Sequence, residues 1–267
     1  EAAVSGAGDC WEAVGEGALV DRGHDGIGRA FNERGGPRGA RIGPDARGVG
    51  NKGRVCPYHG WAYNLDGGLR GIANRDTFPP MQADKWGLKP LEMEIWNGLV
   101  FIRFQAGPQP AVAEILARFD DEIAPYDLAN MVPTDSNSMD DLLPVNWKSV
   151  RDVDNEGYHV RQAHPGLHQL YGNGYFDEPY ANGTSRSVGT FNEAYGHRWS
   201  VRKYREILPE ADNLPREQQR QWIYFGMFPN FVLGLYPDSV IYYQEVPQSA
   251  DQTVQRVTCY PRHAERR

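Results

Sequence analysis

The sequence predicts an α+β protein in which a strand-rich N-terminal region precedes a region that combines helices with an antiparallel sheet. Residues 1 to about 105 consist of short apolar runs separated by loops rich in glycine and proline, which break helices and central strands. Apolar residues then recur at helical spacing between 112 and 123, and aromatic and β-branched runs recur from residue 223 onward. These changes of pattern predict two domains, which span residues 1–107 and 108–267.

Two segments characterise the N-terminal region. The run 34–39 combines glycines with a proline and therefore predicts a loop. Residues 91–104 alternate and then become continuously apolar, which predicts a hairpin that turns at Asn97-Gly98. Pro108 and Pro110 follow this hairpin and mark the predicted domain boundary.

The C-terminal region is expected to form helices first and a sheet afterwards. Pro110 precedes the helical spacing of 112–123, and a second helix is predicted from residue 147 to about 159. The polar stretch 177–187, rich in Asn, Gly and Ser, predicts a loop. Runs separated by proline-containing turns then predict an antiparallel meander, with strands at residues 223–225, 231–233, 240–243 and 254–260.

The composition argues against several classes of function. The chain carries 28 Lys and Arg against 35 Asp and Glu, a net charge of −7, which disfavours a nucleic-acid-binding face. No apolar run approaches the ~20 residues that a membrane span needs, and no signal-peptide pattern opens the chain. Its 3 cysteines are too few and too scattered for a disulfide framework, so we expect a soluble, cytoplasmic protein.

The first cluster of chemically competent residues contains Cys56 and His59. A thiolate and an imidazole three positions apart on one tight loop suit a metal ion or an iron–sulfur centre. Taken alone, the spacing also fits a zinc site, or a buried cysteine beside a hydrogen-bonded histidine.

The second cluster contains His159 and His164. Two histidines near the end of a helix, which Pro165 terminates, can supply neighbouring ligands to one divalent ion, although such pairs also occur in structural roles. Glu156 lies three positions before His159 and is expected on the same helical face, where its carboxylate can orient the imidazole. A carboxylate from elsewhere would complete the facial triad of a non-haem iron site.

Taken together, the run 56–61 and the pattern Glu156-x-x-His159-x4-His164-Pro165 resemble the Rieske non-haem iron oxygenases. More specifically, the chain is similar to the catalytic α subunit of the ring-hydroxylating dioxygenase family. Further segments that carry the resemblance are residues 38–41, 63–67, 98–104 and 146–148.

The resemblance implies an N-terminal Rieske β-sandwich domain that binds a [2Fe–2S] cluster through Cys56 and His59. It implies a C-terminal, helix-flanked antiparallel sheet with mononuclear Fe(II) on His159 and His164. The assembly would be a cyclic homotrimer, or a hetero-oligomer with a small β subunit, in which Glu156 bridges His159 and the partner subunit's His59. Electrons from NAD(P)H would arrive through a separate reductase, with or without a ferredoxin, and O2 would oxidise a small organic substrate.

Two features depart from the family pattern. The second cluster-binding pair, Cys-x-His, would fall at Gly35 and Pro37, neither of which can bind iron. The alternatives are loss of the cluster, deliberate substitution, or a local error in the sequence. The family's third iron ligand, normally an aspartate, would fall beyond Arg267, so we expect an incomplete C-terminal domain; Asp251 and Glu265 do not match its context.

The substrate class stays open between two alternatives. A glutamate at position 156 is similar to the branch that oxidises quaternary ammonium compounds such as carnitine, glycine betaine and choline. An aromatic acid or hydrocarbon fits the wider family.

The missing ligands also leave a second hypothesis, a non-catalytic member that acts as a binding or assembly subunit. The aromatic residues from Trp199 to Tyr243 are expected mostly in the core, with some lining a substrate pocket, and His168 is not expected to be a ligand.

Overall fold

The computed structural model describes four stretches of the chain, residues 17–36, 38–42, 53–208 and 211–262. The chain divides into two compact units, Glu1–Val112 and Ala113–Arg267, called unit 1 and unit 2 below. Within the described stretches, no helix is both long enough and apolar enough to cross a membrane.

The division between the units lies after Val112 instead of before Pro108, because the proline-rich segment is tied back to unit 1. The Arg103 guanidinium donates a hydrogen bond to the carbonyl of Pro110 at 2.9 Å. The backbone N–H of Val112 donates to the Glu94 carboxylate at 2.8 Å. These two hydrogen bonds join the hairpin of unit 1 to the segment in which the prolines predicted the domain boundary.

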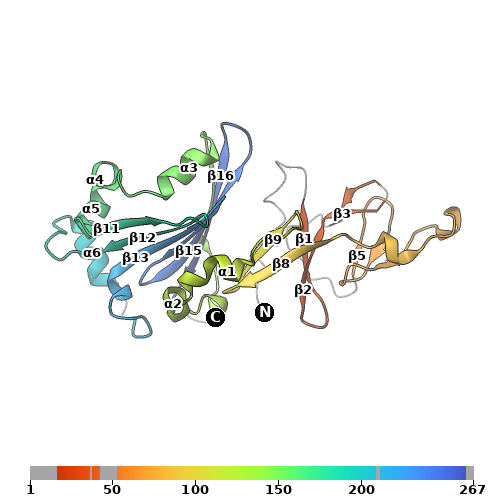
Figure 1. The fold of residues 1–267 in the computed structure, drawn as a ribbon, viewed down its shortest axis with the longest axis horizontal. Helices are drawn as coiled ribbons and strands as arrows, with labels where there is room; N and C mark the ends of the chain where they lie inside the picture. Colours follow the sequence, from red (N-terminus) through yellow and green to blue (C-terminus); the bar gives the residue numbers. More distant parts are fainter. Residues whose placement is uncertain (1–16, 37, 43–52, 209–210, 263–267) are drawn as a thin grey trace. The chain divides into compact units, whose positions relative to one another are not determined.

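Unit 1 is built on a four-stranded antiparallel sheet in the order β1–β2–β8–β9. The predicted hairpin is confirmed, since Asn97-Gly98 connects β8 to β9. A two-stranded hairpin and a three-stranded sheet complete the unit (Figure 1). The elements are β1 Ala18–Arg22, β2 Gly28–Asn32, β3 Arg34–Gly35, β4 Ala40–Arg41, β5 Arg54–Val55, β6 Ala62–Tyr63, β7 Leu69–Gly71, η2 Arg75–Thr77, η3 Ala83–Trp86, β8 Pro90–Trp96 and β9 Leu99–Arg103.

One apolar core joins the small hairpins of unit 1 to its main sheet. Cys56, Trp61 and Tyr63, from the β5–β6 hairpin, are buried together with Phe31 of β2. Gly36, which follows β3, lies against the same rings, because a Cβ added there would be 3.6 Å from the Tyr63 hydroxyl oxygen. The β3–β4 hairpin therefore packs beside the β5–β6 hairpin.

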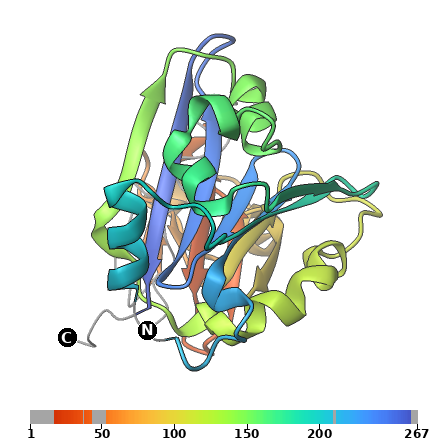
Figure 2. The same ribbon diagram turned by 90° about the vertical axis from the view of Figure 1, so that its left-hand side faces the viewer.

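Unit 2 contains a seven-stranded antiparallel sheet in the order β10–β16–β15–β14–β13–β12–β11 (Figures 1 and 2). The predicted meander is confirmed, because the four predicted strands are β13 to β16 and each pairs with the next. Strand β10 was not predicted. The strands are β10 Thr134–Leu143, β11 Tyr175–Pro179, β12 Thr184–Thr190, β13 Gln221–Met227, β14 Phe231–Leu235, β15 Ser239–Pro247 and β16 Thr253–Pro261.

The loop predicted at residues 177–187 is wrong, because this segment forms most of the β11–β12 hairpin. Polar pairs stabilise it: Asp177 lies opposite Ser187 and accepts its hydroxyl hydrogen bond at 2.7 Å. Arg186 forms an ion pair with Glu122 at 2.5 Å. A strand held by cross-strand polar contacts lacks the apolar alternation on which the prediction depended.

Helices cover both faces of the unit 2 sheet (Figures 1 and 2). The helix predicted at 112–123 is interrupted by a 3-10 turn, and its Phe119 stacks on Phe225 of β13 at a centroid distance of 4.2 Å. On the opposite face, Tyr171 and Tyr204 contact Trp222 of the same strand. The helical elements are α1 Val112–Leu116, η4 Ala117–Phe119, α2 Asp120–Ile123, η5 Ala124–Tyr126, η6 Leu128–Asn130, α3 Trp147–Asp154, α4 Val160–Ala163, α5 Pro165–Tyr171, α6 Trp199–Ile207 and η7 Gln218–Arg220.

Candidate metal centres

The turn between α3 and α4 carries two residues of the second cluster, Glu156 and His159. The helix predicted to continue to about 159 ends at Asp154, so this prediction is wrong in its extent. A Cβ at Gly157 would overlap the Tyr175 ring, and the Gly157 N–H donates to Asp177 at 2.7 Å instead of to a helical carbonyl. Glu156 and the following histidine therefore meet across a turn, not along a helical face.

The Glu156 carboxylate contacts His159 at two points. Its Oε1 lies 2.5 Å from the ring Nδ1, and its Oε2 accepts the backbone N–H of His159 at 3.1 Å. Burial acts to raise the pKa of Glu156, but the hydrogen bonds from His159 outweigh it and lower the pKa below its ordinary value. An ionised Glu156 holds the hydrogen on Nδ1, which leaves the Nε2 lone pair of the ring available to a metal.

His164 lies at the junction of α4 and α5, where Pro165 occupies the first turn of the second helix. The rings of His159 and His164 are 5.0 Å apart between centroids and inclined at 73°. Two neighbouring imidazoles of which one is oriented by a carboxylate fit a divalent iron as two of its ligands. Throughout the described stretches, no group of three His, Cys, Asp or Glu side chains is close enough to hold a metal, so a third ligand is not assigned.

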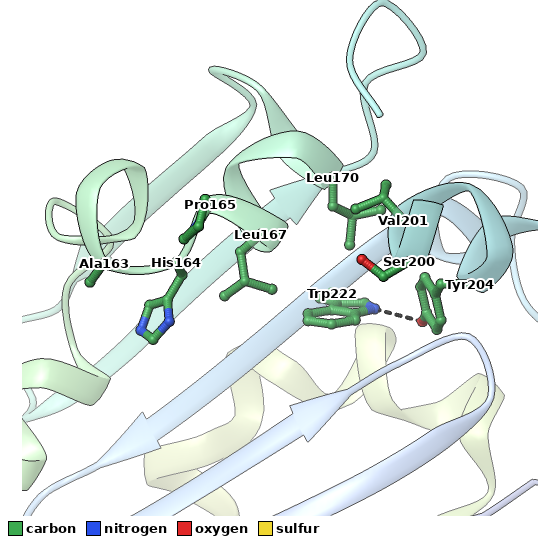
Figure 3. Close-up of a pocket in the computed structure, with 10 residues that line it drawn as sticks. Ala163, His164, Pro165, Leu167, Leu170, Ser200, Val201, Tyr204 and Trp222 are labelled. Carbon is green, nitrogen blue, oxygen red and sulfur yellow. Dashed lines mark hydrogen bonds between the residues drawn. The ribbon is translucent and has the colours of Figure 1, made fainter. Parts of the chain in front are cut away.

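A cleft of about 350 Å³ opens beside His164, between α5, α6 and β13 (Figure 3). Its walls are largely apolar, with Leu167 and Leu170 on one side and the Trp222 and Tyr204 rings on the other. The Trp222 indole N–H donates to the Tyr204 hydroxyl oxygen at 2.8 Å, which fixes both rings. A mainly apolar cleft next to two candidate ligands can hold a small organic molecule.

The aromatic residues of this region do not all occupy the core. Phe225 is fully buried, as expected, but Trp199 and Phe228 are exposed by 71% and 67%. The expectation was for most of the set, not all of it, and these two exceptions lie at a helix start and in a turn, where no packed layer covers the ring. The His168 ring packs against that of Tyr195, with 5.8 Å between the ring centroids.

In unit 1, Cys56 and His59 lie on the connection between β5 and β6. The Cys56 N–H donates to the Trp61 carbonyl at 2.8 Å, and the Gly60 N–H donates to the Cys56 carbonyl at 2.9 Å, which makes a tight turn. Cys56 is buried and free, whereas His59 is exposed and its ring lies 3.9 Å from that of Tyr58.

This donor set does not fit a [2Fe–2S] cluster by itself. Such a cluster needs two protein ligands on each iron, and Cys56 with His59 supplies one for each. The neighbouring β3–β4 hairpin has Gly35 at the position expected for a cysteine, and glycine has no donor side chain. Pro37, the position expected for a histidine, lies outside the described residues and also lacks a donor. Cys10 and Glu265 lie outside the described residues as well.

Comparison with known proteins identifies the family. Residues 126–267 match the ring hydroxylating alpha subunit family (catalytic domain) over more than half of the chain. The chain belongs to this family. A glycine betaine monooxygenase oxygenase subunit of Chromohalobacter salexigens is 33% identical to this alpha subunit over 192 residues, which are 70% of the chain and 42% of the relative. A carnitine monooxygenase oxygenase subunit of Escherichia coli is 30% identical over 162 residues, which are 58% of the chain and 41% of the relative.

Solved structures show that the fold is shared. The quaternary ammonium Rieske monooxygenase CntA, in complex with L-carnitine, matches this alpha subunit with a TM-score of 0.72 and 22% identity, over 94% of this chain and 63% of CntA. Naphthalene 1,2-dioxygenase with bound indole matches with a TM-score of 0.71 and 18% identity, over 94% of this chain and 62% of the dioxygenase. The predicted mixture of helix and sheet is therefore confirmed, and the chain spans less than half the length of the curated relatives named above.

Proposed function

We propose that this alpha subunit is part of a terminal oxygenase that uses O2 and external electrons to hydroxylate or oxidatively demethylate a small organic substrate. The observation that carries the proposal is the neighbouring pair His159 and His164, of which His159 is oriented by Glu156, beside an apolar cleft. The named relatives are oxygenase subunits, and they give no support to the alternative of a non-catalytic assembly subunit.

In this proposal His159 and His164 are two ligands of a mononuclear Fe(II), and a carboxylate is the third. Iron bound there would supply open coordination positions at which O2 is activated. Glu156 keeps the Nδ1 hydrogen of His159 in place, so that Nε2 presents its lone pair in one fixed direction. The apolar side chains of the cleft, Leu167 and Leu170 among them, limit the water around a bound substrate.

We propose a quaternary ammonium compound as the favoured substrate class, with an aromatic acid or hydrocarbon as the alternative. The support is twofold: relatives are named for glycine betaine and carnitine, and two hydrogen-bonded aromatic rings line the cleft. A cation over the face of Trp222 would gain ~0.5–2 kcal/mol, and burial in the cleft moves this value toward the upper end. Binding of a trimethylammonium compound and of its uncharged tert-butyl analogue to wild type and Trp222→Leu tests this assignment. Equal loss of both ligands in the variant would contradict it.

The electron supply and the assembly are further parts of the proposal. We expect electrons from NAD(P)H through a separate reductase, with or without a ferredoxin, and a homotrimer or a hetero-oligomer with a β subunit. A [2Fe–2S] cluster does not fit the described ligands of unit 1, so no electron step is assigned to Cys56 and His59. These two residues still suit a metal such as zinc.

The test is metal analysis of anaerobically purified protein. We expect His159→Ala and His164→Ala to lose iron, while the control His168→Ala keeps it, since His168 packs against Tyr195. Equal iron content in all three variants would refute the proposed site.

Acid-labile sulfide in the same samples tests unit 1. About three irons and two sulfides per chain would require ligands other than Gly35 and Pro37. About one iron without sulfide would mean that the cluster is absent.

A further inference from the structure

A buried charged cluster lies beneath the C-terminal end of α3. Glu245 of β15 is completely buried, and Arg151 of α3 is 5% exposed. Asp154, the last residue of α3, faces both of them. The Arg151 guanidinium lies over the backbone of Gly226 on β13, where a Cβ would overlap it. Neither the sequence pattern nor the family resemblance had singled out Arg151 or Glu245.

The cluster contains two carboxyl groups and one guanidinium. Burial raises the pKa of Glu245 to about 8, and the facing Asp154 adds to the rise. Within the described residues, no donor side chain bonds either oxygen of Glu245, so a hydrogen bond between the two carboxyls requires a proton on one of them, and the stronger rise in pKa favours Glu245 as its carrier. Protonated Glu245 can then donate to Asp154, whose remaining charge Arg151 balances.

This cluster is one of three tethers on the turn that follows α3. Buried Asp154 faces the fully buried Glu245 of β15, so one proton shared between the two carboxyls would tie the end of α3 to the sheet. One residue later, Asn155 accepts the Ser185 hydroxyl of β12 at 3.0 Å. Two residues after that, the Gly157 N–H donates to Asp177 of β11 at 2.7 Å. The tethers flank Glu156 on both sides and come from three different strands.

We propose that Asp154 and Glu245, together with the Asp177 tether, are positioning residues that fix the α3–α4 turn so that Glu156 reaches both the ring Nδ1 and the backbone N–H of His159. A turn held at one point could swing, whereas anchors on both sides of Glu156 fix its backbone. The importance of this role for catalysis rests on the proposed function, but the positioning itself concerns only the residues of this chain.

The test reads the His159 ring directly, without metal. In protein labelled with ¹⁵N-histidine, long-range ¹H–¹⁵N spectra distinguish a ring that carries its hydrogen on Nδ1 from one that exchanges between tautomers. His159 is assigned by the signal lost in His159→Gln. We expect a single Nδ1–H form in wild type and a mixture of forms in Glu245→Ala and in Asp177→Ala.

Two variants separate positioning from general stability. Glu245→Gln, whose amide can donate to Asp154 as the protonated acid does, should restore the single tautomer. Val240→Ala removes buried atoms from the same strand, but on the face opposite to Glu245. It should leave the tautomer unchanged. If Glu245→Ala does not fold, the exposed Asp177 decides the matter. A single tautomer in both Glu245→Ala and Asp177→Ala would overturn the proposal.

A Co²⁺ titration of the same variants separates this inference from the proposed function. Loss of the tether should weaken Co²⁺ binding about tenfold, as for other groups that orient a metal-binding histidine. If wild type shows the single tautomer, the variants lose it and no protein binds Co²⁺, the positioning role stands and the iron site fails. If Co²⁺ binds equally to wild type and to variants that have lost the tautomer, the positioning role stands, and its expected effect on metal binding is refuted.

Discussion

The buried Glu245 predicts an unusual pH dependence of the stability of unit 2. In the unfolded chain this carboxyl releases its proton near its ordinary pKa of 4.5, whereas in the folded protein it holds the proton to about pH 8. Between these values the folded state binds one more proton than the unfolded state. Its contribution to stability is therefore complete below about pH 4.5 and declines as the pH rises to about 8.

The size of the effect follows from the same two values. One proton of difference corresponds to a slope of about 1.4 kcal/mol per pH unit, and the whole interval of about 3.5 pH units corresponds to the order of 5 kcal/mol. Asp154, whose pKa is raised by burial against the opposing effects of Glu245 and Arg151, adds to the slope in the same direction. In Glu245→Gln no proton is taken up at this position, so the slope should be smaller by one proton.

The assay is urea unfolding at several pH values between about 5 and 8. Unfolding is monitored by hydrogen exchange in peptides of β15, which report on unit 2 alone. A matched control is Glu94→Gln, which changes a carboxylate of unit 1 that accepts the Val112 N–H. We expect the wild-type and Glu94→Gln profiles to fall together as the pH rises, while the Glu245→Gln profile is flatter. Parallel profiles for wild type and Glu245→Gln would refute the reasoning, because Glu245 would then be ionised in the folded protein at neutral pH.

Three further predictions concern the site and the packing of unit 2. Glu156→Gln should keep iron bound but slow product formation at least about tenfold, because an amide holds the His159 ring less firmly; wild-type turnover in this variant would contradict the role of Glu156. Phe119→Ala should lower the free energy of unfolding by about 3–5 kcal/mol, since the ring is fully buried against Phe225. Phe176→Ala, at a side chain exposed by 65%, is its control and should change stability by less than about 0.5 kcal/mol in urea titrations. Asn146→Ala should cost about 1 kcal/mol or more, because Asn146 caps α3 through Lys148 N and also bonds the Ala250 carbonyl; an unchanged urea midpoint would show that neither bond matters.

The sequence predicted the elements whose stability depends on apolar periodicity. Strand β13 of the meander alternates between the two faces of the sheet, with Ile223 and Phe225 on one face and Trp222 and Tyr224 on the other. The hairpin 177–187 escaped prediction because its strands are held by cross-strand polar bonds such as Ser187 to Asp177. Hydrophobic patterning reports only the first kind of strand.

The candidate iron site was reached from the sequence although the local structure was partly mistaken. A continuous helix would place Glu156 and His159 on one face, and the observed turn brings them together by a different route, through the backbone N–H as well as the ring. The spacing of three residues permits both geometries. The contact between Glu156 and His159 could therefore be predicted, but the turn that produces it could not. The tethers at Glu245 and Asp177 could not be predicted, because each lies far along the chain and only strand register brings it beneath the turn.

The same contrast explains why unit 1 and unit 2 lead to different conclusions about their metals. In unit 2 both candidate ligands and the orienting carboxylate lie within nine residues, so one short turn brings them together. In unit 1 a four-ligand centre would have to draw on two hairpins, and the β3–β4 hairpin forms although Gly35 and Pro37 supply no donors, since the core of Phe31, Trp61 and Tyr63 needs no ligand from that hairpin. A backbone that keeps its hairpins after losing its ligands is therefore not evidence for the cluster, and the sulfide content of the protein must decide whether one is bound.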